Sequence, residues 1–339
     1  MRSYDLHGLR LAVTGWEEAA VALHGRLEPL ASGAEVGEPD LVFEIGVGPE
    51  ADGFERPEQG RPVYEPPAGE VLFDAAADRI WIGLGPDRRA VCEPARGRAR
   101  LWARHGTGED LWLLSHPLFT LPLVEMLKRR GLWALHAAGL LWNGKAVVLA
   151  GASGSGKSTL TLALVRAGFG FLGDDTLFLH VPPLPGGCEC VWERGLGGEG
   201  SGGAGLRLLA FPDEVDLTDE TAAFFPELAP LRAEPRRDGW RKRRLRAEET
   251  YGAPLAAEVA PGLLVFPRIS GHEESALSPM DPGEALIELA SNVLLTEPAS
   301  SQAHLDALAA LTAASACWRL ETGRDLDGAV RLLRDLAER

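Results

Sequence analysis

Residues 151–158 have the types and spacing that bind phosphate groups. The segment Gly151-Ala-Ser-Gly-Ser-Gly-Lys-Ser158 matches the pattern G-x-x-x-x-G-K-S/T of a phosphate-binding loop. Its glycines allow successive backbone N–H groups to turn inward around an anion at a helix N-terminus. In such loops the lysine reaches the β- and γ-phosphates, and the following hydroxyl binds Mg²⁺. The residues expected to contact a nucleoside triphosphate are Gly151, Ala152, Ser153, Gly154, Ser155, Gly156, Lys157, Ser158 and Thr159.

The segments around this loop are those that a phosphate site requires. The apolar run Lys145–Ala150 predicts a strand that enters the loop, and the periodic segment Leu160–Ala167 predicts the helix that leaves it. Asn143-Gly144 predicts a tight turn, so that the preceding apolar run Trp133–Trp142 forms a hairpin with the entering strand. A hairpin is therefore expected to lead into the loop.

Two consecutive carboxylates, Asp174 and Asp175, follow the apolar run Phe169–Gly173. Phosphoryl transfer to a hydroxyl needs a carboxylate that holds the metal and a group that accepts the hydroxyl proton. Adjacent side chains of an extended segment point in opposite directions, so one carboxylate can face the metal and its neighbour the substrate. An ordinary acidic turn is the alternative.

A basic segment, Arg236–Arg246, concentrates seven positive residues in a chain whose net charge is −15. Arginines near a transferred phosphoryl group stabilise its charge, so the segment is a candidate acceptor site. Within it, Arg241 and Arg243 are expected to share one side of a strand. The alternative is a solvated face that pairs with acidic neighbours such as Glu248 and Glu249.

These motifs together resemble the catalytic domain of the HPr kinase/phosphorylase family. The shared residues are Leu135-His136-Ala-Ala, the loop, Arg166-Ala-Gly168 and the Asp174-Asp175 pair, so the resemblance spans roughly residues 130–180. It implies a phosphoenolpyruvate carboxykinase-like nucleotide-binding fold, with Lys157 catalytic and Ser158 on the metal. It further implies that Asp175 accepts the proton of the substrate hydroxyl and that His136 lies beside it. Of the two adjacent carboxylates, Asp174 is then the one predicted to face the metal.

The chain also departs from that family. Thr159 stands where the family has Glu, and Glu193-Arg-Gly-Leu-Gly197 resembles the family's second metal-binding element with the acid shifted by one. The segment tied to phosphorolysis is missing, and Phe266–Gly271 in its place makes Arg268 a candidate substrate contact. The chain therefore resembles a related serine-kinase-like protein, not the bifunctional regulator.

The predicted fold class is α/β (α+β), with a small α+β domain over residues 1–112 and the nucleotide-binding domain over 113–339. The first domain is expected to contain strands Leu9–Val13 and Leu41–Val47 around a helix at Trp16–Leu30. An antiparallel meander follows, whose last strand is Leu111–Leu114. Helices of the second domain are expected at His116–Arg130, Glu284–Leu295, Ser301–Ala314 and Leu326–Ala337, and its later strands at Leu206–Phe211, Leu263–Arg268 and Cys317–Leu320.

Composition limits the function classes. The net charge of −15 argues against a general nucleic-acid binder. No apolar run approaches the roughly 20 residues of a membrane span, and the N-terminus lacks the apolar core of a signal peptide. Four cysteines, of which only Cys188 and Cys190 are close together, do not form a disulfide framework. We therefore expect a cytoplasmic protein with neither a nucleic-acid nor a membrane partner; a homo-oligomer remains open.

The leading hypothesis is a kinase that uses ATP and Mg²⁺ to phosphorylate a hydroxyl. The acceptor is a serine of a protein or peptide, or a small-molecule alcohol. The alternative is a nucleotide-binding switch without turnover; the combination of His136, Lys157, Ser158 and Asp175 favours the enzyme, because a pure binder needs no base directed at a hydroxyl. An ATPase motor would need a second acidic motif that the sequence does not contain convincingly.

Overall fold

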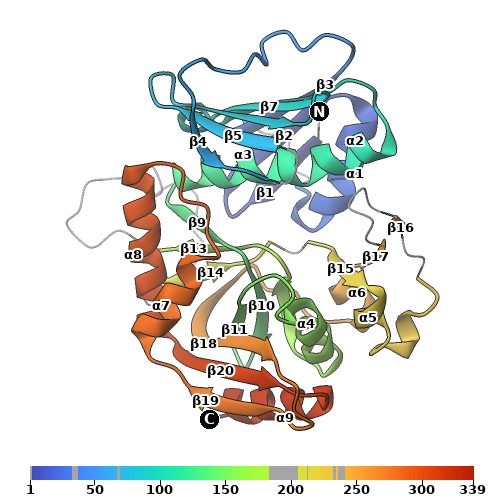
Figure 1. Cartoon of the computed structure of the whole chain (residues 1–339), viewed down its shortest axis with the longest axis vertical. Helices are drawn as coiled ribbons and strands as arrows, with labels where there is room; N and C mark the ends of the chain where they lie inside the picture. The colour runs from blue at the N-terminus through green and yellow to red at the C-terminus, as the bar shows by residue number, and fades with distance from the viewer. Residues whose placement is uncertain are drawn as a thin grey trace. The chain divides into compact units, whose positions relative to one another are not determined.

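The computed structural model describes residues 2–32, 37–66, 69–182, 205–211, 213–231, 234–235 and 241–339. The fold is mixed α/β, and the chain divides into two compact units (Figure 1). The described part of the first unit runs to Leu132 and takes in Leu294–Gln302, and the second begins at Trp133. None of the described helices has the length and hydrophobicity to cross a lipid bilayer.

The first unit is built on an eight-stranded sheet with the order β1-β2-β3-β8-β7-β6-β5-β4. The strands from β5 to β8 form the antiparallel meander that the sequence predicts. The sequence pattern did not indicate β4, which extends the meander by one antiparallel strand, whereas β2, β3 and β8 run parallel to one another. The strands are β1 (Arg2–Leu6), β2 (Leu9–Gly15), β3 (Leu41–Val47), β4 (Arg61–Tyr64), β5 (Gly69–Asp74), β6 (Arg79–Leu84), β7 (Arg88–Glu93) and β8 (Arg98–Ala103).

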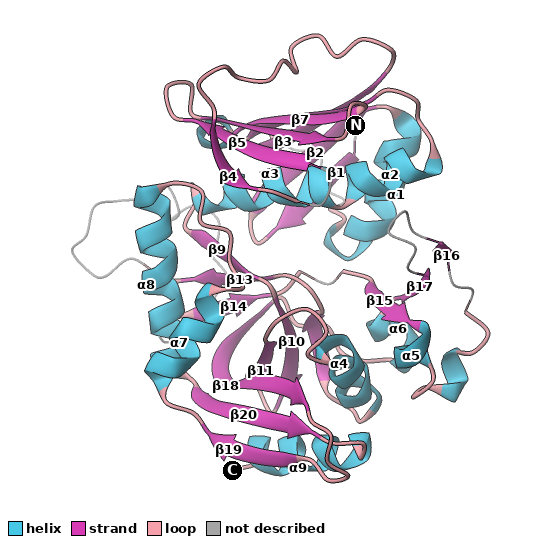
Figure 2. Cartoon of the chain, in the orientation of Figure 1, coloured by secondary structure: helices cyan, strands magenta, loops and turns pink. Residues whose placement is uncertain are grey.

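Three helices lie on one face of this sheet (Figure 2). They are α1 (Glu17–Leu27), α2 (Gly108–Ser115) and α3 (Pro117–Lys128), with short 3₁₀ turns η1 (Glu28–Leu30) and η2 (Pro94–Arg96). Phe43 of β3 and Phe119 of α3 are both fully buried, and their ring centroids are 4.5 Å apart. Aromatic packing between sheet and helix therefore anchors the core of this unit.

The strand predicted at Leu111–Leu114 is wrong, because these residues belong to helix α2. Thr107 and Asp110 form a capping box: each side chain accepts a hydrogen bond from the other residue's backbone N–H. This local hydrogen bonding starts a helix that the apolar pattern alone did not indicate. The boundary expected at 112/113 falls inside α2, and α3 packs on β7 and β8, within the first unit.

The second unit is built on a sheet whose centre is the long strand β18 (Glu258–Ile269). On one side β18 runs parallel to β11, which forms a hairpin with β10, and β10 pairs with β12. On the other side it runs parallel to β20, and its first residues pair with β14. The remaining strands are β9 (Leu132–Leu135), β10 (Ala137–Trp142), β11 (Lys145–Ala150), β12 (Gly170–Gly173), β13 (Leu177–His180), β14 (Arg207–Leu209), β19 (Ala276–Pro279) and β20 (Ala316–Thr322).

Helices cover both faces of this sheet (Figure 1). Val147 and Leu149 pack in one cluster with α4 and α9, whereas Ala146 and Val148 pack in another with α7 and α8. Because side chains of a strand alternate between faces, the apolar run of β11 fills both cores. The helices are α4 (Lys157–Arg166), α7 (Pro282–Ala290), α8 (Pro298–Ala314) and α9 (Leu326–Ala337).

A smaller element packs beside α4. It consists of a three-stranded sheet in the order β15-β17-β16 with short helices around it. Val215, Leu217 and Phe225 of this element share a buried cluster with Leu160 and Leu164 of α4. Its members are β15 (Val215–Thr218), α5 (Asp219–Ala222), η4 (Pro226–Leu228), β16 (Glu234–Pro235), β17 (Arg241–Leu245) and α6 (Ala247–Tyr251).

We predict that Asp110→Ala strongly destabilises the first unit. Asp110 is fully buried and lies 2.5 Å from the buried Arg88 guanidinium. Burial raises the pKa of Asp110, but hydrogen bonds from Thr107 and Arg88 outweigh that effect and hold the pKa below its ordinary value. Removing the carboxylate leaves the buried Arg88 guanidinium with only its longer contact of 3.5 Å to Glu109, at an expected cost of about 3 kcal/mol in the free energy of unfolding at neutral pH. Urea denaturation followed by tryptophan fluorescence measures this cost.

The matched control is Asp87→Ala, which removes a carboxylate that pairs with the exposed Arg104 at 2.7 Å. Solvent screens that pair, so the control is expected to cost about 1 kcal/mol or less. Since the pKa of Asp110 is lowered by folding, its contribution is present above the ordinary carboxyl pKa of about 4 and is lost as the pH falls below it. Equal costs for the two variants at pH 7 would contradict the prediction.

Candidate functional site

The predicted phosphate loop lies between β11 and α4. Gly151, Gly154 and Gly156 have φ angles of 152°, 80° and 94°, which residues with a side chain rarely adopt. Gly156 is the N-cap of α4, and its carbonyl accepts the first helical hydrogen bond, from the Leu160 N–H at 3.0 Å. The glycines therefore allow the chain to curl at the end of a buried strand and enter a helix, which is the backbone arrangement that binds phosphate.

Lys157 is buried at the start of this helix. Its Nζ donates hydrogen bonds to the carbonyl oxygens of Gly151 at 2.7 Å and Ala152 at 3.2 Å, so the ammonium lies against the loop. Burial lowers the pKa of Lys157, and the carboxylates of Asp175 and Asp174 partly oppose that effect. The positive charge is thus held beside the loop and beside both predicted acids.

Asp174 lies beneath the loop with only 5% of its surface exposed. Its Oδ2 accepts a hydrogen bond of 2.8 Å from Ser158 Oγ, and its Oδ1 is buried without a hydrogen-bond partner among the described residues. Burial raises the pKa of Asp174 to about 7, with a further increase from Asp175, while the Ser158 hydrogen bond opposes the rise.

These oxygen atoms fit a hard cation such as Mg²⁺. A carboxylate oxygen without a partner and an adjacent hydroxyl are ligands that Mg²⁺ prefers, and this ion usually completes its shell with water and phosphate oxygens. No group of three or more His, Cys, Asp or Glu side chains able to hold a metal occurs among the described residues. Within the described residues, Ser158 and Asp174 thus offer two oxygen ligands to a metal, and phosphate or water oxygens would fill further positions.

Asp175 and His136 form an accessible pair. The side chain of Asp175 is 69% exposed and that of His136 is 44% exposed. His136 Nδ1 lies 3.1 Å from Asp175 Oδ1 and 3.0 Å from the Asp175 carbonyl oxygen. Since a carbonyl oxygen only accepts hydrogen bonds, Nδ1 carries the proton in this arrangement.

Strand pairing brings these two residues together. The predicted strand Trp133–Trp142 is interrupted at His136, which separates β9 from β10 and donates its backbone N–H to the Asn292 carbonyl at 3.0 Å. Strand β12 pairs with β10 in the register Gly139↔Gly173. The residues that follow β12 therefore return to the start of β10, where His136 is.

On the other side of the loop lies the end of β18. A Cβ atom on Gly156 would contact Ile269 Cγ1 at 3.5 Å, and the side chain of Ile269 is 64% exposed. Arg268 is exposed, and its guanidinium forms no hydrogen bond or ion pair within the described part of the chain. Because adjacent side chains of a strand point to opposite faces, the Arg268 side chain leaves β18 on the face opposite to that of Ile269.

The basic segment is only partly described. Residues 236–240 lie outside the described part, and for Arg241 only the backbone, in β17, is described. Arg243 Nη1 pairs with Asp219 Oδ1 at 2.6 Å, and Arg246 pairs with Glu248 at 3.1 Å and Glu249 at 3.0 Å. These contacts match the alternative in which the segment pairs with acidic neighbours. Cys188, Cys190 and the segment Glu193–Gly197 also lie outside the described residues.

One contact at the site was not expected from the sequence. Thr159, in the first turn of α4, forms a hydrogen bond of 3.0 Å with Thr221 of α5 through their side-chain oxygens. The two residues are 62 positions apart, and neither the composition nor the periodicity around Thr221 indicates a role. The smaller element is therefore linked directly to the phosphate loop.

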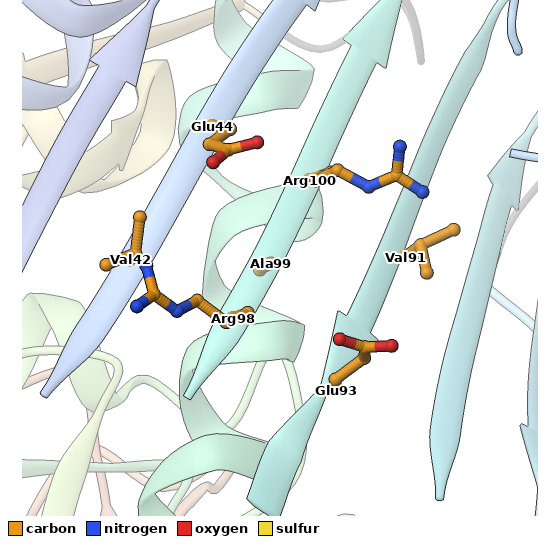
Figure 3. Close-up of a pocket in the computed structure, with 7 residues that line it drawn as sticks. All are labelled: Val42, Glu44, Val91, Glu93, Arg98, Ala99 and Arg100. Carbon is orange, nitrogen blue, oxygen red and sulfur yellow. The ribbon is translucent and has the colours of Figure 1, made fainter. Parts of the chain in front are cut away.

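A cavity in the first unit has different chemistry. A hollow of about 290 Å³ opens on the sheet face formed by β3, β8 and β7 (Figure 3). Glu44 lies opposite Arg100, and Glu93 lies opposite Arg98, in the cross-strand register. The charges on this face thus alternate, and none of the predicted site residues lines the hollow.

Comparisons with family models and with curated proteins found no match for this chain. Among solved structures, the HPr(Ser) kinase/phosphatase from Coxiella burnetii matches with 12% identity and a TM-score of 0.27. That match covers 60% of this chain and 94% of the other. With so low a TM-score, nothing about this chain is concluded from it.

We predict a pH-dependent effect of Asp174→Asn on the stability of the protein without ligands. The pKa of Asp174 is raised by folding to about 7, so its contribution to stability is present at low pH and is lost as the pH rises toward 7. Between pH 5 and pH 8 the wild-type protein should therefore lose about 2–3 kcal/mol of unfolding free energy relative to the variant. Urea denaturation in the presence of EDTA at the two pH values measures the difference.

Asp175→Asn is the matched control, because this neighbouring carboxylate is 69% exposed. Its stability should fall over the same pH range as that of the wild type, but by less, because the contribution of Asp175 to the raised pKa of Asp174 is lost. A profile for Asp174→Asn that parallels the wild-type one would show that the buried carboxylate does not titrate in this range.

Proposed function

We propose that this chain is a kinase that transfers the γ-phosphoryl group of ATP to a hydroxyl, on a phosphoenolpyruvate carboxykinase-like nucleotide-binding domain. The observation that carries the proposal is the exposed Asp175–His136 pair beside a phosphate loop whose Lys157 is buried. A protein that only binds nucleotide has no use for an accessible carboxylate next to the phosphates. A group that accepts a proton from an attacking hydroxyl must be accessible and near them.

The phosphate end of the nucleotide is assigned to the loop and to α4. The backbone N–H groups of residues 151–156 and the ammonium of Lys157 bind the β- and γ-phosphates. Ser158 Oγ and Asp174 Oδ1 are the oxygen ligands that the chain offers to Mg²⁺, which offsets phosphate charge when bound. In this role Asp174 Oδ1, which is buried without a hydrogen-bond partner among the described residues, would contact the metal.

Asp175 is assigned as the base. The acceptor oxygen bonds to the γ-phosphorus as the bond to the ADP oxygen breaks, and the hydroxyl proton passes to the Asp175 carboxylate. His136, which lies 3.1 Å from this carboxylate, orients it through Nδ1–H. Asp174 is unsuitable as the base, because it is buried and its Oδ2 is already bonded to Ser158.

The acceptor is a serine hydroxyl of a protein or peptide, or a small-molecule alcohol. An exposed base accommodates either, since neither the His136 nor the Asp175 side chain is enclosed. Arg268, an exposed side chain of β18 without an ion pair in the described part of the chain, is the arginine that we assign to the acceptor.

We predict that Lys157→Ala abolishes ATP-dependent transfer and weakens triphosphate binding. The change removes the ammonium that contacts the β- and γ-phosphates. Transfer is measured with γ-labelled ATP against fractionated lysate proteins and small alcohols, and the labelled product is identified by mass spectrometry. Lys145→Ala, which alters an exposed lysine at the start of the same β-α unit, is the matched control and should retain activity. Wild-type turnover in Lys157→Ala would refute the nucleotide site.

We predict that Asp175→Asn reduces transfer by about 10²–10⁴ and changes Mg·ATP affinity only a few-fold, as expected for the loss of a general base. Asp174→Asn should instead weaken Mg·ATP binding, because it alters the metal ligand. Titration calorimetry gives the affinities, and the same labelled-ATP assay gives the rates. If the two variants exchange these behaviours, the roles of the two aspartates are reversed.

A further inference from the structure

Side-chain contacts connect β17 to the first turn of α4. Arg243 Nη1 pairs with Asp219 Oδ1 at 2.6 Å, at the start of helix α5. The preceding residue, Thr218, caps this helix, and its Oγ1 lies 3.3 Å from Thr221 Oγ1. Thr221 Oγ1 in turn lies 3.0 Å from Thr159 Oγ1. These contacts connect the arginine to the residue that follows Ser158 of the phosphate loop.

One arrangement of the three hydroxyl protons gives each contact in this series a donor and an acceptor. A threonine hydroxyl has one proton to donate and can accept two hydrogen bonds. Thr218 Oγ1 accepts from the Thr221 backbone N–H at 3.2 Å and donates its own proton to Thr221 Oγ1. Either oxygen can donate in the contact of 3.0 Å between Thr221 and Thr159. The direction in which Thr221, having accepted from Thr218, donates to Thr159 Oγ1 leaves the proton of Thr159 free for another acceptor. At the N-terminus of α4 that acceptor is a phosphate oxygen, if the loop binds nucleotide as proposed.

The Arg243 guanidinium contacts protein groups through both Nε and Nη1. Besides the Asp219 pair, its Nε donates to the Leu231 carbonyl at 2.8 Å, and only 20% of its side chain is exposed. A group held in this way by a carboxylate and a carbonyl is poorly placed to clamp an acceptor. It is well placed to hold the start of α5 in position.

We infer that Thr221 and Arg243 are positioning residues for the nucleotide: they hold the Thr159 hydroxyl with its proton directed at the phosphate loop. This inference rests on the proposed function and extends it by assigning α5 and β17 to nucleotide binding. Arg243 thereby acts through Asp219 and Thr221, not by contact with the acceptor. Val215 and Leu217 of β15 share a buried cluster with Leu160, and this apolar packing holds β15 against α4.

The test compares Mg·ATP affinity in Thr221→Val and Thr221→Ser by titration calorimetry. Valine keeps the shape and removes the hydroxyl, so the dissociation constant is expected to rise about three- to tenfold, as for one lost hydrogen bond. Serine restores the hydroxyl and should restore the affinity. Thr312→Val is the matched control: it removes a buried hydroxyl that bonds to the Ala309 carbonyl on α8, which packs on the opposite face of the sheet. It should leave the affinity unchanged even if stability falls.

Arg243→Gln distinguishes positioning from direct contact. If Arg243 acts through Thr221, the single variant weakens Mg·ATP binding no more than Thr221→Val, and the double variant binds as Thr221→Val does. Independent, additive losses would overturn the inference, and so would wild-type affinity in Thr221→Val.

Lys157→Ala, measured in the same titration, distinguishes a failure of this inference from a failure of the proposed function. If Lys157→Ala weakens binding and Thr221→Val does not, the inference fails and the proposed function stands. If Lys157→Ala has wild-type affinity, the proposed function itself fails.

Discussion

The hydrogen bond of 2.8 Å between Ser158 Oγ and Asp174 Oδ2 is the contact on which the candidate site depends. It requires a carboxylate beneath the loop, where burial disfavours its charged form and raises its pKa to about 7. Most folds avoid such burial, and strongly perturbed acids concentrate at functional sites. The three strands β11, β10 and β12 must all pair correctly to place Asp174 there, so the topology of this half of the sheet and the site form together.

Asp174 and Asp175 are consecutive in the sequence, but one is buried and the other is exposed to solvent. Asp174 is 5% exposed, whereas the side chain of Asp175 is 69% exposed and lies beside His136. Consecutive side chains at the end of a strand point to opposite sides, so the first enters the protein and the second meets solvent. A buried acid suits a metal and an exposed one suits proton transfer, and the fold supplies both from two adjacent residues.

The first unit has its own core and its own buried charges. Besides Arg88 and Asp110, the Glu125 carboxylate lies 2.7 Å from Lys128 Nζ and accepts a hydrogen bond of 2.8 Å from Thr296 Oγ1. Buried charges of this kind are tolerated only when each is paired. Thr296 lies between α7 and α8, far along the sequence, so this unit is completed by a segment that returns from the second half of the chain.

The sequence by itself determined the local features: the glycine-rich loop, the strand before it, the helix after it, and the two aspartates at the end of an apolar run. These follow from backbone preferences and from periodicities of neighbouring residues, which operate within a few positions. The resemblance predicted that His136 lies beside Asp175, 39 positions away, but only the tertiary structure showed the contact between them. Only the tertiary structure decided that Thr221 meets Thr159, 62 positions away. It also decided that Arg243 is held by Asp219 and that α3 packs with the first unit. Such contacts depend on how strands pair and helices pack over long sequence separations, and no local pattern in the sequence encodes them.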